Sequence, residues 1–506
     1  MAPKDAPAFT PVAALPGIVA AARAAFASGK TRDVAWRKAQ LRAIIRAVEE
    51  NMGAISEALQ ADLRRPQFEV VVAEALTVTA EARHALAHLD GWVRPRSVAT
   101  PPGLLPGSSW TKAEPLGVAL IVAPWNFPIQ LVFSPLVGAL AAGNTAVLKP
   151  SEVAPACSAV VVDLVRRYLD ADAVHVVTGG VPETAALLEQ RFDVIMYTGN
   201  SAVARVVATA AAKHLTPLIL ELGGKCPAVV AADADMAVTA RRLLASKLLN
   251  AGQVCLAPDY VLVEDAADAE ARLLAALRAA LVEFHGAEPQ ASASLGRIVN
   301  ARHWARVAGL LDGCGGTVVA GGTTDRADLY VAPTIVSRPA LDSALMRDEI
   351  FGPILPVLPV PSLDAAAAFV TARAKPLALY VFSGSTARAR AVINATSSGA
   401  AVINEAVVQI TNCDLPFGGV QESGMGAYHG HDGFRAFSHT KAVYQSWGPL
   451  DMGQLRYPPY TPGQLRLVRT LLGSLPQRLP LPGWRDVLIA GLATAVAVLV
   501  ARQQQQ

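Results

Sequence analysis

From residue 116 onward, short apolar runs of strand length alternate with stretches of helical periodicity, and this alternation limits the folds open to the chain. The expected strands cover 116–123, 145–148, 174–177, 194–197 and 218–220, and the expected helices cover 128–142, 154–169, 182–190 and 201–214. Strands that alternate with helices over short connections predict a parallel, doubly wound α/β sheet. Ligands of such sheets bind beyond the carboxyl ends of the strands.

The flanking regions indicate further parts of the fold. Residues 17–94 show helical periodicity, whereas 95–112 are rich in Pro, Gly and Ser and interrupt it. A second stretch of strands and helices runs from about 223 to 404. With 506 residues, of which 52% are hydrophobic and 17% charged, the chain can form several packed domains.

Charge and cysteine content exclude several classes of protein. The net charge is +3, and the basic excess lies in residues 451–506, which hold six Arg and two Asp. Because the rest of the chain is nearly neutral, we expect no nucleic-acid partner. The five Cys include no C-x-x-C pair, and their odd number argues against a disulfide framework. His429 and His431 lack other clustered ligands, so we expect no metal.

Three residues have the chemistry of a catalytic group. Cys255, in N-A-G-Q-V-C, is a candidate nucleophile, because a thiolate is reactive near neutral pH. Glu221, in E-L-G-G-K, comes at the expected end of a strand, where burial raises the pKa of a carboxyl toward that of a general base. Asn126, in P-W-N-F-P, can donate its amide to a developing oxyanion. A buried structural Cys, a capping or surface acid and a turn Asn are the respective alternatives.

Other polar residues follow neighbouring strands and suggest a nucleotide site. Thr198, Gly199 and Asn200 join a strand to a helix whose N-terminus suits a pyrophosphate, although the match to G-x-G-x-x-G is poor. Lys149 and Glu152, in K-P-S-E, follow another strand and can hydrogen-bond ribose hydroxyls, with a solvated charge as the alternative for each. Taken alone, E-I-F-G-P at 349–353 and P-F-G-G at 416–419 are typical of turns with a buried Phe.

Taken together, these segments resemble the aldehyde dehydrogenase superfamily. The motifs P-W-N-F-P, K-P-S-E, T-G-N, E-L-G-G-K, G-Q-x-C, E-I-F-G-P and P-F-G-G occur in that family's order between residues 124 and 419. Two segments are similar to the class 3, fatty aldehyde dehydrogenase branch: A-G-Q-x-C-x-A-P-D-Y at 251–260 and S-G-M-G-A-Y-H-G at 423–430. Ala204 and Cys226 depart from the family pattern, where Gly and Ser are usual, but neither departure removes a catalytic group.

The resemblance implies a catalytic role for each candidate. Cys255 would attack the aldehyde carbon, while the Asn126 side chain and the Cys255 backbone N–H would hold the oxyanion. Glu221 would activate the water that hydrolyses the resulting thioester.

The resemblance also implies a cofactor, NAD, with NADP as an alternative. The residues expected to bind it are Trp125, Lys149, Glu152, Thr198, Gly199, Asn200, Glu349 and Phe351. The Glu152 carboxylate would repel a 2′-phosphate, which favours NAD over NADP.

The implied fold is that of aldehyde dehydrogenases: a doubly wound cofactor-binding domain, an α/β catalytic domain and a small β arm for oligomerisation. We place the NAD(P)-binding domain at 1–94 and 113–222 and the catalytic domain at 223–411. The oligomerisation arm takes 95–112 and 412–450, and would form a homodimer.

Two segments follow the arm. Residues 451–483 form a basic segment with the pattern of an interfacial helix or gate, and 484–502 form a hydrophobic stretch. Within it, Val487–Ala501 is uncharged, and as a helix it spans about 22 Å against a hydrocarbon core of about 30 Å. We expect a membrane tail, with the catalytic body in the cytosol at the endoplasmic reticulum or another intracellular membrane. A buried C-terminal helix is the alternative.

The predicted function is the NAD(P)-dependent oxidation of long-chain (fatty) or isoprenoid aldehydes to carboxylic acids through a cysteine thioester. An apocarotenoid or retinoid aldehyde dehydrogenase is an alternative within the same class. A non-catalytic, membrane-tethered scaffold is an alternative of another class, against which Cys255, Glu221 and Asn126 speak.

Overall fold

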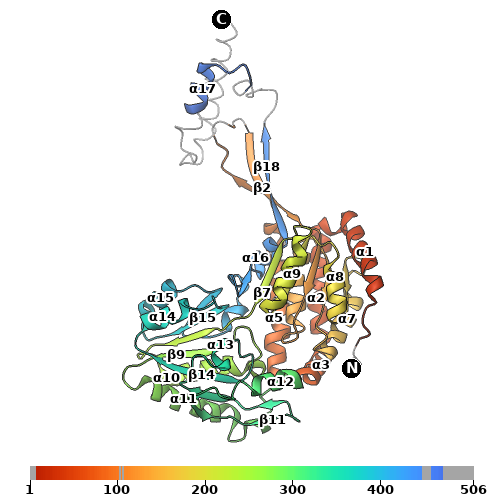
Figure 1. Cartoon of the computed structure of the whole chain (residues 1–506). Coiled ribbons are helices and arrows are strands. Elements are labelled where there is room, and N and C mark those ends of the chain that lie inside the picture. The colour runs from red at the N-terminus through yellow and green to blue at the C-terminus, as the bar shows by residue number, and fades with distance from the viewer. Residues whose placement is uncertain (1–6, 102–103, 105–106, 447–456, 471–506) are drawn as a thin grey trace. The chain divides into compact units, whose positions relative to one another are not determined.

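A computed structural model describes residues 7–101, 104, 107–446 and 457–470 of the chain, which divides into two compact units (Figure 1). Residues 1–89 and 115–438 belong to unit 1, and residues 90–114 and 439–506 belong to unit 2. Both the expected cofactor-binding domain and the expected catalytic domain therefore lie mainly in unit 1. The boundary between them at 222/223 stays a prediction.

The first sheet of unit 1 has six strands. In spatial order they are β17 (Gly424–Met425), β7 (Leu218–Leu222), β6 (Val194–Gly199), β3 (Val118–Val122), β4 (Thr145–Lys149) and β5 (Val174–Val176). Every pair is parallel except β17 with β7. The chain order reverses between β3 and β6, and such a reversal opens a crevice at the carboxyl ends of the two strands.

Helices connect these strands as the sequence predicts. They are α6 (Gln130–Ala142), α7 (Pro155–Tyr168), α8 (Val181–Leu188) and α9 (Ser201–Ala212). Local chemistry sets their ends: Gly143 ends α6 in a left-handed conformation, Pro155 begins α7, and Asn200 caps α9 by accepting from the Val203 N–H. The doubly wound α/β fold is thus confirmed.

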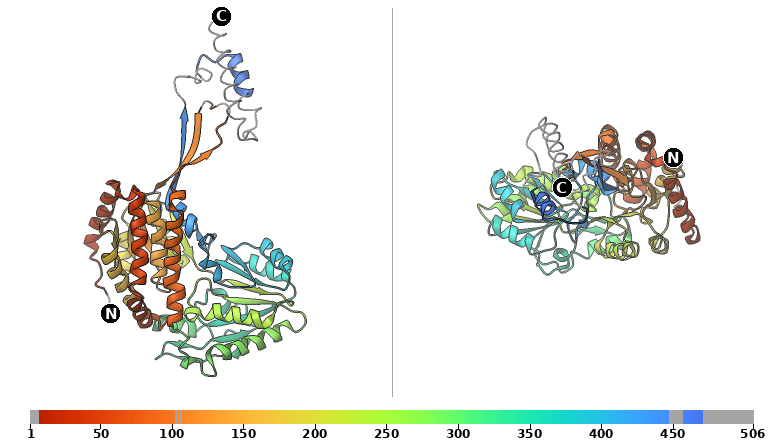
Figure 2. Two further views of the ribbon diagram at one scale, coloured as in Figure 1. Left: turned by 180° about the vertical axis from the view of Figure 1, so that it is seen from behind. Right: turned by 90° about the horizontal axis from the view of Figure 1, so that it is seen from above.

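Alternate residues of the strands build the core on one face of this sheet. Val118, Leu120 and Val122 of β3 share a buried cluster with residues of α1 (Leu15–Ala27), α8 and α9. Every second residue of a strand points to the same face, which explains this pattern. The remaining long N-terminal helices are α2 (Val34–Glu49), α3 (Met52–Leu63) and α5 (Leu76–Trp92), and the red to orange helices lie side by side in Figure 2.

A second sheet of seven strands completes unit 1. Its spatial order is β10 (Thr317–Ala320), β13 (Thr334–Ser337), β14 (Ile354–Val360), β9 (Tyr260–Glu264), β8 (Pro227–Val230), β15 (Ala378–Phe382) and β16 (Ala400–Ile403). Only β10 runs antiparallel to its neighbour. The helix α10 (Met236–Leu248) leads from this sheet into the segment that holds Cys255.

Unit 2 contains a three-stranded sheet of β1 (Arg96–Val98), β2 (Gly107–Pro115) and β18 (Ser438–Ser446). These strands fall largely within the residues expected to form the oligomerisation arm. Residues 412–437, which the sequence interpretation also assigns to the arm, belong instead to unit 1, where β17 pairs with β7.

The basic segment 451–483 is described only at residues 457–470, where α17 (Pro462–Arg469) begins at a capping box formed by Thr461 and Gln464. The expected membrane tail, 484–502, lies outside the described residues. Within the part of the chain that the structure describes, no helix is both long and apolar enough to cross a bilayer.

Candidate active site

Cys255 follows a tight turn, η5 (Leu249–Gly252), at the end of α10. Asn250, Ala251 and Gly252 all have positive φ angles, of 50°, 52° and 78°. A Cβ atom on Gly252 would lie 2.2 Å from the carbonyl oxygen of Gly352. Only glycine therefore permits this close approach between the turn before Cys255 and the E-I-F-G-P segment.

Glu221 lies in β7 and is almost completely buried. Its carboxyl lies beside the Cys255 thiol, and its Oε1 atom has no hydrogen-bond partner. Burial raises the pKa of Glu221 to about 8, and the contact with the thiol opposes that rise. A carboxyl with this pKa is mostly protonated at pH 7, and its ionised fraction can accept a proton as a general base does.

The pKa of the Cys255 thiol is also raised, first by burial and then by the negative charges of Glu221 and Glu349. The thiol of the free protein is therefore mainly protonated at pH 7. To become a nucleophile, the thiol needs a neighbouring base that removes its proton when the substrate binds. Glu221 is in contact with the thiol.

Asn126 follows β3 at the point where the strand order reverses, and it is 3% exposed. Its Nδ2 atom donates to the Gln253 carbonyl at 3.1 Å, two residues before Cys255. An amide NH₂ has two hydrogens, so one remains for a second acceptor. The structure thus brings the three candidate catalytic residues to the same turn.

Six of the residues expected to bind the cofactor, Trp125, Lys149, Glu152, Thr198, Gly199 and Asn200, lie at or just after the carboxyl ends of parallel strands of the first sheet, whereas Glu349 and Phe351 precede β14. Lys149 ends β4, and its Nζ donates to Glu152 at 2.7 Å. Thr198 and Gly199 end β6, next to Glu221 in the register of β7. Asn200 begins α9, so its side chain is used as the helix cap. This is the end of the sheet at which nucleotides bind in doubly wound folds.

Glu349 provides a direct test of whether the site fits a dinucleotide. The residue is half-buried, its Oε1 atom is buried and has no hydrogen-bond partner, and a Cβ atom on Gly223 would lie 2.2 Å from its Oε2. Burial, together with the charges of Asp259 and Glu221, raises the pKa of Glu349 to about 8. A buried acceptor without a donor beside the strand ends matches the need to bind a ribose hydroxyl.

An aromatic cluster lies beside the Glu349 segment. The Trp125 ring packs edge-on against Phe351 at 5.3 Å and against His303 at 4.9 Å between centroids. Burial and the neighbouring Arg306 and Arg302 lower the pKa of His303 to about 4, so the ring is neutral at pH 7. Sequence reasoning missed His303, because a single His in a helix carries no local signal of its partners.

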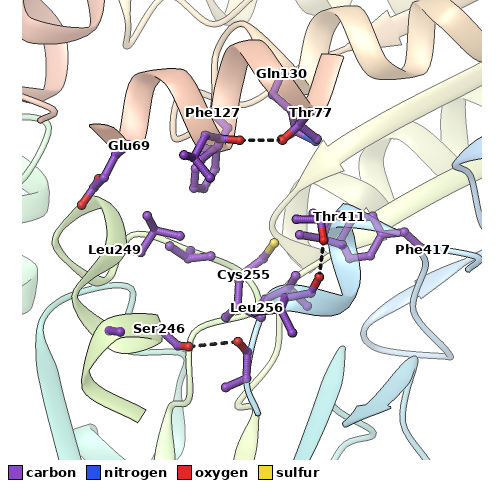
Figure 3. Close-up of a pocket in the computed structure, with 18 of the residues that line it drawn as sticks. Glu69, Thr77, Phe127, Gln130, Ser246, Leu249, Cys255, Leu256, Thr411 and Phe417 are labelled. Carbon is purple, nitrogen blue, oxygen red and sulfur yellow. Dashed lines mark hydrogen bonds between the residues drawn. The ribbon is translucent and has the colours of Figure 1, made fainter. Parts of the chain in front are cut away.

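Cys255 also lines a cavity of about 280 Å³ (Figure 3). Most of the other lining side chains are apolar: Phe68, Val72, Ala73, Phe127, Leu131, Ala245, Leu249, Val254, Leu256, Ala406, Val407, Val408, Ile410 and Phe417. Figure 3 shows the sulfur of Cys255 facing this space, with Phe127 and Phe417 on either side. The thiol of Cys255 therefore faces a mainly hydrophobic cavity.

The raised pKa of Glu221 predicts a pH-dependent stability. Its carboxyl ionises near pH 4.5 when exposed but near pH 8 in the folded protein, so the folded state holds more protons between these values and loses stability as the pH rises. We expect Glu221→Gln to have a higher unfolding midpoint than wild type at pH 8.5, with a much smaller difference at pH 5. Calorimetry measures both midpoints.

The variant Glu288→Gln, at an exposed acid, corrects for the change in overall charge. An equal difference between Glu221→Gln and wild type at the two pH values would contradict the assigned pKa.

Comparison with known proteins agrees with this geometry. The aldehyde dehydrogenase family model matches residues 11–443. The chain is 44% identical to aldehyde dehydrogenase family 3 member B1 of Bos taurus over 88% of this chain and 95% of that one. It is 43% identical to the dimeric NADP-preferring aldehyde dehydrogenase of Mus musculus over 87% and 97% of the respective chains.

Among solved structures, the substrate-bound state of Staphylococcus aureus AldH superimposes with a TM-score of 0.87 at 39% identity, over 90% of this chain and 99% of that one. The sequence matches extend over nearly the whole of both chains, and they include the segments that hold Cys255, Glu221 and Asn126. The chain therefore belongs to the aldehyde dehydrogenase family and is an NAD(P)-dependent aldehyde dehydrogenase.

Proposed function

We propose that the protein oxidises hydrophobic aldehydes, either long-chain (fatty) or isoprenoid, to carboxylic acids through a thioester on Cys255. The observation that carries the proposal is the position of Cys255, whose thiol contacts Glu221 and faces a cavity lined mainly by apolar side chains. A hydrocarbon chain bound there gains from leaving water, at roughly 0.8 kcal/mol for each buried CH₂.

The first half of the reaction forms the thioester. Glu221 accepts the thiol proton, and the Cys255 sulfur forms a bond to the carbonyl carbon of the aldehyde. The free amide hydrogen of Asn126 and the Cys255 backbone N–H stabilise the negative charge on the oxygen. A bound NAD or NADP would supply the acceptor for the hydride that leaves this carbon. The carbonyl then re-forms as a thioester.

The second half hydrolyses the thioester. Glu221 first releases to solvent the proton that it took from the thiol. Its carboxylate then removes a proton from water, the resulting hydroxide forms a bond to the thioester carbon, and the bond between carbon and sulfur breaks. The sulfur takes the proton held by Glu221, so the carboxylic acid leaves and the thiol of Cys255 is restored. A base with a pKa near 8 serves both proton transfers at neutral pH.

Lys149, Glu152 and Glu349 are proposed to bind the two ribose units of the cofactor, with Thr198, Gly199, Asn200, Trp125 and Phe351 around them. The Lys149–Glu152 ion pair supports this assignment, because it gives a ribose both a donor and an acceptor at the end of β4.

The central prediction concerns turnover. We expect purified protein to reduce NAD or NADP with saturated aldehydes, and kcat/KM to rise with chain length because each added methylene buries more apolar surface. Cys255→Ala should lose activity by about 10⁴-fold or more. Cys413→Ala, at a cysteine that does not line the cavity, should retain it. Absorbance of the reduced cofactor measures each rate.

Activity confined to short aldehydes would contradict the hydrophobic substrate but not the chemistry. Turnover of apocarotenals in preference to saturated aldehydes would favour the apocarotenoid or retinoid alternative. No turnover at all, with a biological effect retained by Cys255→Ala, would favour the scaffold.

A membrane tail at 484–502 is a further part of the proposal. Its support is the uncharged run Val487–Ala501, preceded by a basic segment in which α17 presents Arg466 and Arg469. Such a tail would hold the enzyme, with its catalytic body in the cytosol, beside aldehydes dissolved in a bilayer. The β sheet of unit 2 is proposed to join two copies of the chain.

Deleting residues 484–506 should move the protein from the membrane fraction to the soluble fraction, because the apolar run is the segment expected to insert. Fractionation of cells that express either form measures the distribution, and Cys255→Ala serves as a full-length control. Equal membrane association of the two forms would contradict the tail.

A further inference from the structure

Arg65 and Glu74 form an ion pair in which both side chains are fully buried. Arg65 follows α3, and Glu74 lies in the single-turn π segment η3 (Val70–Ala75). Neither side chain lines the cavity around Cys255. A buried ion pair contributes little to stability unless its remaining donors and acceptors are also satisfied. The partners of this pair therefore indicate what it does.

Arg65 holds one end of the segment that carries Asn126. Its Nη2 donates to the Asn126 carbonyl oxygen, its Nη1 donates to Glu74, and its Nε donates to the Asn250 side chain at 3.3 Å. The guanidinium also lies over the Phe127 ring, with 4.5 Å to the centroid. Three acceptors in different directions suit the rigid fork of an Arg and not the single ammonium of a Lys.

Glu74 holds the other end of the same segment. Its Oε2 accepts from the backbone N–H of Gln130 at 2.6 Å and from that of Ile129 at 3.2 Å. Burial raises the pKa of Glu74, but the Arg65 charge and these hydrogen bonds counter the rise and favour the carboxylate. The ion pair thus holds residues 126–130 through the Asn126 carbonyl and the backbone N–H groups of Ile129 and Gln130.

The same network reaches the turn before Cys255. Asn250 Nδ2 donates to the Asn126 carbonyl at 2.9 Å, and the Asn250 N–H donates to Glu69 at 2.9 Å. The Asn126 amide in turn donates to the Gln253 carbonyl. Contacts that begin at Arg65 and Glu74 therefore hold the Asn126 backbone, and Asn250, which donates to the Gln253 carbonyl as well, links them to the acceptor of the Asn126 side chain.

We infer that the Arg65–Glu74 pair is a positioning device for the oxyanion donor: it holds Asn126 so that its free amide hydrogen faces the oxygen formed at Cys255. This inference rests on the proposed role of Asn126. A donor fixed in advance needs no reorganisation when the charge develops, which makes it effective in the transition state. Neither Arg65 nor Glu74 touches the substrate.

The test is a double-mutant cycle that combines Glu74→Gln with Asn126→Ala. Removing the charge of Glu74 should lower kcat by about 10- to 100-fold, somewhat less than the loss of the donor itself. In the Asn126→Ala background the same change should lower kcat by less than about threefold, because effects that pass through one group do not add. The KM for NAD should stay within about twofold of wild type.

Arg37→Lys is the matched control. Arg37 is also buried and donates to backbone carbonyls, those of Thr31, Arg32 and Ala141, but it makes no contact with residues 126–130. The control should lower the unfolding midpoint without lowering kcat. Arg65→Lys, combined with Asn126→Ala, gives a second double-mutant cycle. The Lys keeps the positive charge but lacks the fork geometry of the guanidinium.

Equal loss of kcat in both Asn126 backgrounds would overturn the inference, as would unchanged kcat in both Glu74→Gln and Arg65→Lys. Failure of both variants to fold would also overturn it, because the pair would then serve the fold alone. If wild-type protein oxidises no aldehyde, the proposed function fails first, and the two failures are thereby distinguished.

Discussion

The contact between the Cys255 thiol and the Glu221 carboxyl is the interaction on which the rest of the site depends. Burial raises the pKa of both groups; the contact raises the pKa of the thiol further but lowers that of Glu221, and most of their protons stay in place at neutral pH. In the proposed reaction, chemistry begins only when a bound carbonyl gives the sulfur a carbon to attack. Around this contact lie the candidate oxyanion donor Asn126, a largely apolar cavity and the residues proposed to bind the cofactor.

The contact joins two sheets. Glu221 comes from the six-stranded sheet, and Cys255 comes from a turn that leads into β9 of the seven-stranded sheet. The backbone is closely packed on each side of the contact, at Gly252 against Gly352 and at Gly424 against Leu220, where a Cβ would lie 2.2 Å from the carbonyl oxygen. The cavity is largely apolar; Glu69 and Glu405 line it, whereas Glu221 and Glu349 do not. A hydrocarbon chain bound there, as proposed, would contact mainly apolar side chains.

The sequence predicted the alternating strands and helices well, because apolar run length and helix-ending residues such as Gly143 are local signals. Cys255, Glu221 and Asn126 could be found because each stands in a motif at the end of an element. The Arg65–Glu74 pair could not be found, since charged residues in the pattern of a helix are usually solvated. Their burial depends on partners far away in the chain, at 126–130 and 250. Two other features also join residues that are far apart in the sequence: β17 pairs with β7, and the His303 ring packs against that of Trp125.

In the proposed reaction, Cys255 carries the acyl group and Glu221 activates the water that releases it. Intact-mass measurement of Glu221→Gln, incubated with an aldehyde and NAD, tests this directly. We expect about one equivalent of reduced cofactor to form for each chain, more slowly than in wild type because the thiol has lost its base, after which turnover nearly stops. The protein mass should rise by that of the aldehyde less two hydrogens, at Cys255. Steady turnover without an adduct, or an adduct on another residue, would contradict the claim.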